Sequence, residues 1–126
     1  MAGWILIFDE DVHTRLAIAR VFTRRGFVVI EPANVADVFG CADRLDLACV
    51  FVGVDAPERD AIALLSRLRE AHAQLPVVLV ADRFTGRLAR EACLHGARCC
   101  LQRPVSCAVL EEFVTELCSA QDHAAV

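Results

Sequence analysis

The chain has 126 residues, more than half of them hydrophobic, and a formal net charge of −4. This length suits one domain with its own core, and the composition excludes a disordered chain. No hydrophobic run approaches the roughly 20 residues that a membrane span requires, and the acidic balance argues against gripping a nucleic-acid backbone. The N-terminal segment lacks the basic region and cleavage pattern of a secretory signal. We therefore expect a cytoplasmic protein with no membrane or direct nucleic-acid partner.

Short hydrophobic runs alternate with segments of helical periodicity along the whole chain. The predicted elements, in chain order, are strand 4–8, helix 11–25, strand 27–30, helix 34–42, strand 47–52, helix 57–72, strand 77–81, helix 85–96, strand 98–102 and helix 106–118. Asn34, Thr85 and Ser106 are suitable N-capping residues, and Gly26 can close the first helix in a left-handed conformation.

This alternation predicts a parallel sheet covered by helices on both faces. Residues 1–118 account for one such domain, and residues 119–126, which lack a periodic pattern, are expected to form a tail or linker. In a sheet of this kind a binding site is expected at the carboxyl ends of the strands.

The residues that follow the predicted strands define a polar pocket. They are Asp9-Glu10-Asp11 after the first strand, Gly53 and Asp55 after the third, Ala81 and Asp82 after the fourth, and Arg103-Pro104 after the fifth. Adjacent acids repel one another unless a cation or an arginine compensates them.

The order of these segments resembles the receiver domain of bacterial response regulators, a phosphorylation switch built around one aspartate. Four stretches carry the resemblance, which covers essentially the whole chain: ILIFDED, VFVGVDAPERD, PVVLVA and GARCCLQRP. The resemblance implies a flavodoxin-like, three-layer α/β sandwich of (βα)5 topology, with a parallel five-stranded sheet in the order 2-1-3-4-5. It also implies a role in two-component or phosphorelay signalling.

Compared position by position, only the acidic pair of the family's active site remains. Asp9 and Glu10 match the acids that hold magnesium, whereas Gly53 matches the phosphoacceptor aspartate. The positions of the family's switch hydroxyl, switch aromatic and lysine hold Ala81, Cys100 and Arg103.

These replacements remove the chemistry that the family relies on. Gly53 has no oxygen to attack a phosphoryl donor and none to bind Mg²⁺, so Asp9 and Glu10 would hold the ion weakly or not at all. Arginine is a planar fork and not a conservative substitute for lysine, and the chain contains no lysine. We therefore hypothesise that Arg103 takes the place of the metal by neutralising Asp9, Asp55 or both.

The resulting interpretation is a pseudo-receiver that acts without phosphorylation, as a protein-interaction or dimerisation module and as the regulatory domain of a longer protein. Two alternatives stay open. The first is phosphorylation of Asp55, with Mg²⁺ on Asp9 and Glu10. The second is a redox sensor based on the seven cysteines, although small buried hydrophobic residues are the simpler interpretation of them. No enzyme motif and no zinc-type cysteine spacing is present.

A charge pattern suggests where a partner would bind. Arg83, Arg87 and Arg90 are predicted to share one face of the helix at 85–96, and Glu111 and Glu112 lie on the last helix. These charges predict either two solvated faces or one interaction face, and receivers commonly dimerise through the fourth helix, fifth strand and fifth helix. Complementary charge on such a face would set the register of a homodimer or a docked partner.

Overall fold

The computed structural model describes residues 3–55 and 57–125. In this part of the chain five strands alternate with five helices. In chain order they are β1 (Trp4–Phe8), α1 (Val12–Arg24), β2 (Val28–Ile30), α2 (Val35–Arg44), β3 (Leu47–Gly53), α3 (Glu58–Ala71), β4 (Val77–Ala81), α4 (Gly86–Leu94), β5 (Cys99–Gln102) and α5 (Cys107–Ala125).

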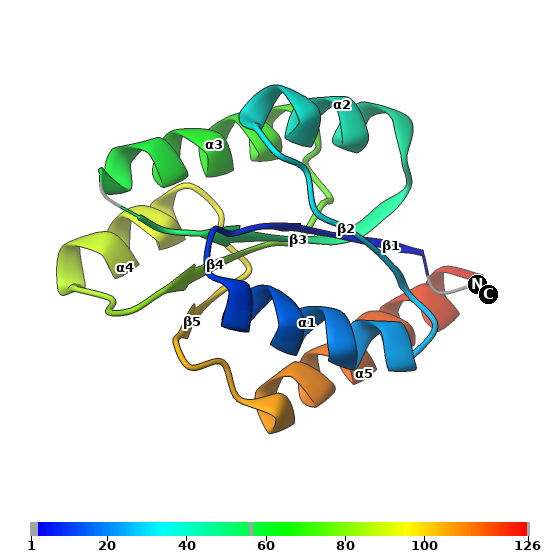
Figure 1. Cartoon of the computed structure of the whole chain (residues 1–126). Helices are drawn as coiled ribbons and strands as arrows, with labels where there is room; N and C mark the ends of the chain where they lie inside the picture. Colours follow the sequence, from blue (N-terminus) through cyan, green and yellow to red (C-terminus); the bar gives the residue numbers. More distant parts are fainter. Residues whose placement is uncertain (1–2, 56, 126) are drawn as a thin grey trace.

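The strands form one parallel sheet in the order β2-β1-β3-β4-β5, which confirms the predicted topology. Helices α1 and α5 cover one face of the sheet, and α2, α3 and α4 cover the other (Figure 1). The strand order reverses between β1 and β3, because the chain leaves β1 first toward β2 and then returns to β3. The carboxyl ends of β1 and β3 therefore lie side by side, where such sheets place their binding sites.

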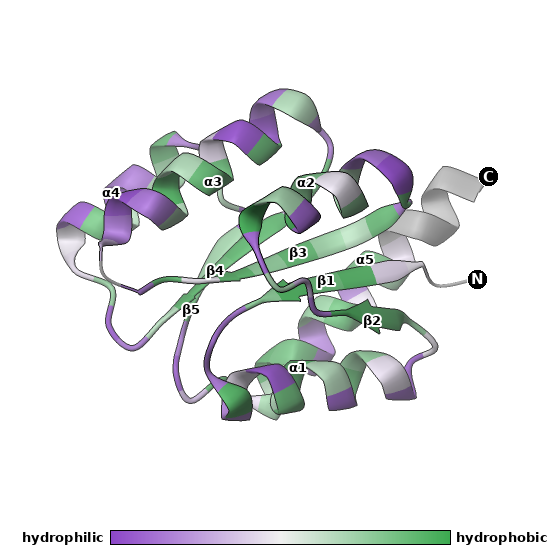
Figure 2. Ribbon diagram, turned by 45° about the horizontal axis from the view of Figure 1, so that its top comes forward, coloured by the Kyte–Doolittle hydropathy of each residue, from purple (hydrophilic) through white to green (hydrophobic). Residues whose placement is uncertain are grey.

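Two hydrophobic layers hold the helices to the sheet. Neighbouring residues of β1 contribute to opposite layers: Leu6 packs under α2 and α3, whereas Ile5 and Ile7 pack under α1 and α5. In the second layer Phe22 and Phe51 meet edge to face, with ring centroids 5.5 Å apart. Figure 2 shows the result, with hydrophobic strands between helices in which hydrophobic and hydrophilic residues alternate.

The helix starts follow the capping chemistry expected from the sequence. Asn34 accepts a hydrogen bond from the Asp37 N–H at 2.9 Å, and Thr85 accepts one from the Leu88 N–H at 3.1 Å. Gly26, just beyond α1, has a φ of 90°, as predicted for a left-handed helix end.

The last helix departs from the sequence-based prediction. Helix α5 continues to Ala125 and does not end at Cys118, so the expected helix end is wrong. Residues 119–125 are helical, and their use as a linker remains a prediction. Among the described residues, no helix has both the length and the hydrophobicity that crossing a bilayer requires.

Candidate functional site

The predicted polar pocket lies at the carboxyl ends of β1 and β3. A cleft of about 270 Å³ opens there, and it brings together four of the residues singled out in the sequence: Asp9, Glu10, Gly53 and Asp55. The other lining residues come from the end of β1, the start of α1 and the loop after β2, and they are Phe8, Arg15, Pro32 and Ala33. Glu10 and Asp55 are exposed at this cleft, whereas Asp9 is buried.

Asp9 and Arg103 form a buried ion pair. The Arg103 Nη2 donates to both carboxylate oxygens of Asp9, at 2.7 and 2.8 Å. The Asp9 side chain is only 1% exposed and that of Arg103 is 11% exposed. Asp9 Oδ1 also accepts the Asp11 N–H at 2.9 Å, so the carboxylate has little freedom to turn. Charge-assisted hydrogen bonds of this kind are among the stronger ones in proteins.

Arg103, which follows β5, connects the pocket to two further elements. Its Nε donates to Thr14 Oγ1 at 3.1 Å, at the start of α1, and its Nη1 donates to Asp82 at 3.4 Å, after β4. Burial acts to lower the pKa of Arg103, but the hydrogen bonds and charges of Asp9 and Asp82 outweigh it, so the pKa is raised on balance. One permanently charged guanidinium therefore links the ends of β1, β4 and β5 to α1. Asp55 is not among its partners.

Asp11 and Thr14 complete this network from the first turn of α1. Asp11 Oδ2 accepts the Thr14 N–H at 2.9 Å and the Thr14 hydroxyl at 2.6 Å. The buried Thr14 hydroxyl donates its hydrogen bond to Asp11, so its oxygen is free to accept a hydrogen bond from Arg103 Nε. These two hydrogen bonds from Thr14 lower the pKa of Asp11 below its ordinary value of 3.8. The helix cap and the buried ion pair thus share one residue.

We expect Asp11→Asn to change how stability depends on pH. Because the folded pKa of Asp11 is lowered, its contribution is present above pH 3.8 and is lost as the pH falls through the folded value. Asparagine can still cap the helix but does not titrate. In urea unfolding at neutral pH and at about pH 3, the advantage of the wild type over the variant should therefore shrink on acidification. A constant difference would contradict this role of Asp11.

Gly53 is required by space rather than by backbone conformation. Its φ lies outside the left-handed region, so other residues could adopt this backbone. A Cβ at position 53 would, however, lie 2.4 Å from Asp9 Cγ and 2.6 and 2.7 Å from the two carboxylate oxygens. The Asp9 carboxylate therefore occupies the space that a side chain at position 53 would fill. Glycine at position 53 thus removes the phosphoacceptor side chain and also leaves the space that the Asp9–Arg103 ion pair needs.

The other positions of the family's switch carry no polar side chain toward the pocket. Ala81 is 3% exposed and, like the half-buried Cys100, packs with the hydrophobic layer under α3 and α4.

Burial raises the pKa of the Cys49, Cys99 and Cys100 thiols. Raised thiol pKa values disfavour the thiolate, which is the reactive form. All seven cysteines are free thiols.

The residues of this pocket do not fit a magnesium ion in the arrangement described. Both Asp9 oxygens accept from Arg103, and position 53 offers no side-chain oxygen. Mg²⁺ requires near-octahedral oxygen coordination. Of the three carboxylates that line the cleft, only those of Glu10 and Asp55 are not bound by Arg103. Within residues 3–55 and 57–125, no three His, Cys, Asp or Glu side chains are grouped so as to hold a metal ion.

The five charged residues expected on one interaction face have different surroundings in the structure. Arg83 precedes α4, which begins at Gly86, so it is not part of the helix. Arg87 lines a groove between α3 and α4. Glu111 pairs with Arg25, just after α1, at 3.0 Å. Arg90 and Glu112 are exposed. Arg87 therefore lies toward α3 and Glu111 toward the end of α1, and an interaction face shared by the five charges stays a prediction.

Sequence reasoning did not anticipate two contributors to the pocket, Thr14 and Arg15. Thr14 accepts a hydrogen bond from Arg103, as does Asp82, which the sequence had already placed at the pocket. Arg15 donates from Nη1 to the carbonyl oxygens of Asp9, at 2.8 Å, and Glu10, at 3.0 Å, and it pairs with Glu31. Thr14 and Arg15 lie in the first turn of a predicted helix that starts at the acidic cluster. Their position at the start of this helix was the sequence feature that could have predicted a contact between both residues and the pocket.

A doubly wound sheet with an acidic pair at the carboxyl end of β1 is the architecture of receiver modules in signalling proteins. The sequence matches the family model for the response regulator receiver domain over residues 5–115, and the chain belongs to this family of two-component signalling.

Known relatives agree with this assignment. The chain is 29% identical over 80 residues to the transcriptional regulatory protein SrrA of Staphylococcus aureus; this stretch covers 64% of the chain but 33% of SrrA. Its fold is similar to that of a response regulator from Thermotoga maritima, with a TM-score of 0.84 at 24% identity over 94% of this chain and 99% of that one. The fold is also similar to that of a CheY-like receiver domain protein from Methanospirillum hungatei, with a TM-score of 0.81 at 16% identity over 96% of this chain and 98% of that one. Both structural comparisons establish the fold.

Proposed function

We propose that this chain is a pseudo-receiver, which transmits its signal by binding protein partners and not by accepting a phosphoryl group. The observation that carries this proposal is the position of Asp9. Its carboxylate fills the space beside Gly53, and Arg103 holds it there. A receiver that lacks the acceptor, and in which one acid of the pair is held by an arginine, has no nucleophile at the acceptor position and too few free carboxylates to bind the metal in the usual way.

In this proposal the positive charge of Arg103 replaces that of the metal ion. It neutralises the most buried acid of the pocket, and through Thr14 and Asp82 it holds the neighbouring elements in one arrangement. The absence of a hydroxyl at Ala81 supports the same function, because no side chain there could report a phosphoryl group to β5. The pocket is thus a fixed structural element, and the outer surfaces of the domain are left to provide recognition.

Phosphorylation of Asp55 is the competing function. Asp55 is exposed, and it lines the same cleft as Asp9 and Glu10. Against this function stands the ion pair, because it withholds the Asp9 oxygens from the Mg²⁺ that such a reaction would need. A redox function is supported less well, since burial raises the pKa of three of the seven thiols.

Acetyl phosphate with Mg²⁺, followed by intact mass spectrometry, distinguishes the first two functions. We expect no adduct of about 80 Da, the mass of a phosphoryl group, because Gly53 offers no nucleophile and Arg103 holds both Asp9 oxygens that a metal would need. A receiver that retains its acceptor aspartate, treated in parallel, must show the adduct. An adduct on this chain that disappears in Asp55→Asn would establish the competing function.

We infer further that the domain regulates a longer protein in the cytoplasm. This inference rests on SrrA, which is a transcriptional regulatory protein by name and of which the matched stretch covers only 33%. Reading the complete open frame around this sequence would test the inference directly.

A further inference from the structure

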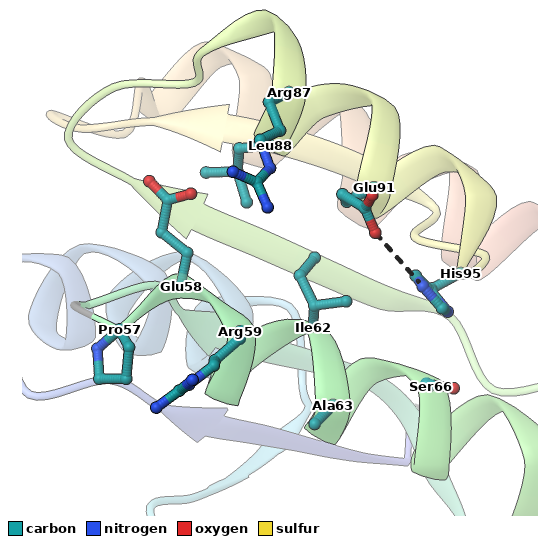
Figure 3. Close-up of a pocket in the computed structure, with 10 residues that line it drawn as sticks. All are labelled: Pro57, Glu58, Arg59, Ile62, Ala63, Ser66, Arg87, Leu88, Glu91 and His95. Atoms are coloured by element: carbon teal, nitrogen blue, oxygen red, sulfur yellow. Dashed lines mark ion pairs between the residues drawn. The ribbon is translucent and has the colours of Figure 1, made fainter.

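We propose that a second copy of this chain docks on the groove between α3 and α4, which we call the α3–α4 groove. The proposal rests on the interaction role proposed above, and it names the partner and the surface. The groove has a volume of about 650 Å³ and shares no lining residue with the acidic pocket. Its lining is drawn in Figure 3 and consists of Pro57, Glu58, Arg59, Ile62, Ala63, Ser66, Arg87, Leu88, Glu91 and His95.

The groove has hydrophobic lining residues and an exposed hydrophobic side chain at one end. Ile62 and Ala63 of α3 and Leu88 of α4 are the hydrophobic residues of its lining, together with Pro57. Beyond His95 a second hollow of about 330 Å³ continues the groove along the same two helices, and Leu94 borders it. Leu94 is 72% exposed, the highest value among the large hydrophobic residues of the described chain. Contact with a partner would remove this hydrophobic surface from water.

The charges of the groove are balanced in sign and arranged across it. Figure 3 shows Glu58 extending from α3 and Arg87 from α4 at the same end of the groove. Neither side chain forms an ion pair with any residue in the described ranges. Toward the other end, Glu91 pairs with His95 at 3.5 Å. The groove therefore offers an unpaired acid and an unpaired base, Glu58 and Arg87, from facing helices, and Arg59 is a second lining base without an ion pair in the described ranges.

This arrangement is self-complementary. A two-fold axis that runs along the groove, between the two helices, would place α3 of one copy against α4 of the other. Arg87 of each copy would then face Glu58 of its partner, and the contact would occur twice, as isologous interfaces require. A partner of one charge sign, such as nucleic acid or a strongly basic peptide, would instead meet repulsion from half of these groups. A second copy of the chain can pair with both the acidic and the basic group of the groove.

Sedimentation equilibrium from about 10 μM to about 1 mM tests the proposal on the intact chain. We expect the wild type to form dimers at the upper concentrations. Arg87→Glu and Glu58→Arg should each raise the dissociation constant about tenfold or more, because each creates two like-charge contacts. An equimolar mixture of the two variants should recover the dimer, since every contact across that interface again joins opposite charges.

Arg90→Glu is the matched control. Arg90 is exposed on the same helix and undergoes the same change of charge, but it does not line the groove. We expect its dissociation constant to equal that of the wild type, and thermal unfolding should show that all variants are folded. A wild type that stays monomeric would overturn the proposal, as would an equal effect of Arg87→Glu and Arg90→Glu, or a mixture that fails to recover. None of these results bears on the phosphorylation test, so the two proposals fail separately.

Discussion

Gly53→Ala should lower the free energy of unfolding by about 1–3 kcal/mol, the usual cost of forcing a methyl group into packed surroundings. The new Cβ would lie 2.4 Å from Asp9 Cγ, so one of the two must move. Asp9 cannot yield cheaply, because Arg103 holds both of its oxygens and its side chain is 1% exposed. Urea unfolding followed by circular dichroism measures the effect.

Gly86→Ala is the matched control for this prediction. A Cβ at Gly86, the first residue of α4, meets no atom within 4 Å, and its φ lies outside the left-handed region. We expect this variant to be neutral or stabilised by about 0.4–1 kcal/mol, since alanine reduces the freedom of the unfolded chain. Equal stabilities of Gly53→Ala and the wild type would mean that the Asp9 carboxylate does not occupy the space beside position 53.

The same geometry predicts the outcome of restoring the family's acceptor. Gly53→Asp would bring a second carboxylate against Asp9, where like charges repel, and it would still face an arginine in place of a lysine. The loss of the acceptor and the gain of the ion pair are therefore not independent changes. Arg103, Asp9 and Gly53 form one structural unit, and reverting a single member conflicts with the other two.

The hydrophobic pattern was sufficient to predict the alternating strands and helices and the parallel sheet, whereas the strand order came from the resemblance to receiver domains. The runs at 4–8 and 77–81 match β1 and β4 at both ends, because strands buried on both faces are hydrophobic throughout and stop at polar residues. The end of α5 was missed for a physical reason. No glycine or proline follows Cys118, and the residues up to Ala125 include three alanines, which have the highest helix propensity.

The composition of the pocket could be predicted, but not its pairing. Strand ends in a parallel sheet converge, so the sequence alone places Asp9, Gly53 and Arg103 near one another. Which acid accepts from Arg103 depends on side-chain directions, and the space beside Gly53 decides it in favour of Asp9. The pairing of Glu111 with Arg25, 86 residues apart, depends in the same way on how α1 and α5 pack.

Arg103→Ala should lower the free energy of unfolding by about 3–5 kcal/mol, the usual cost of leaving one partner of a buried ion pair alone. Arg103 is 11% exposed and Asp9 is 1% exposed, so the loss of the guanidinium leaves a largely buried carboxylate without its counter-charge. Arg25→Ala is the matched comparison. It breaks a pair of similar length, 3.0 Å, whose side chains are 39% and 40% exposed. Because solvent screens that pair, its loss should cost no more than about 1 kcal/mol.

Two further measurements separate the ion pair from simple loss of packing. Asp9→Ala combined with Arg103→Ala removes both charges, so the double variant should be more stable than Arg103→Ala alone despite its larger cavity. Millimolar Mg²⁺ should raise the melting temperature of Arg103→Ala, in which the Asp9 oxygens are released, and leave that of the wild type unchanged. Equal stabilisation of the two proteins by Mg²⁺ would contradict the substitution of Arg103 for the metal, because the wild-type pair would then leave the acids available to the ion.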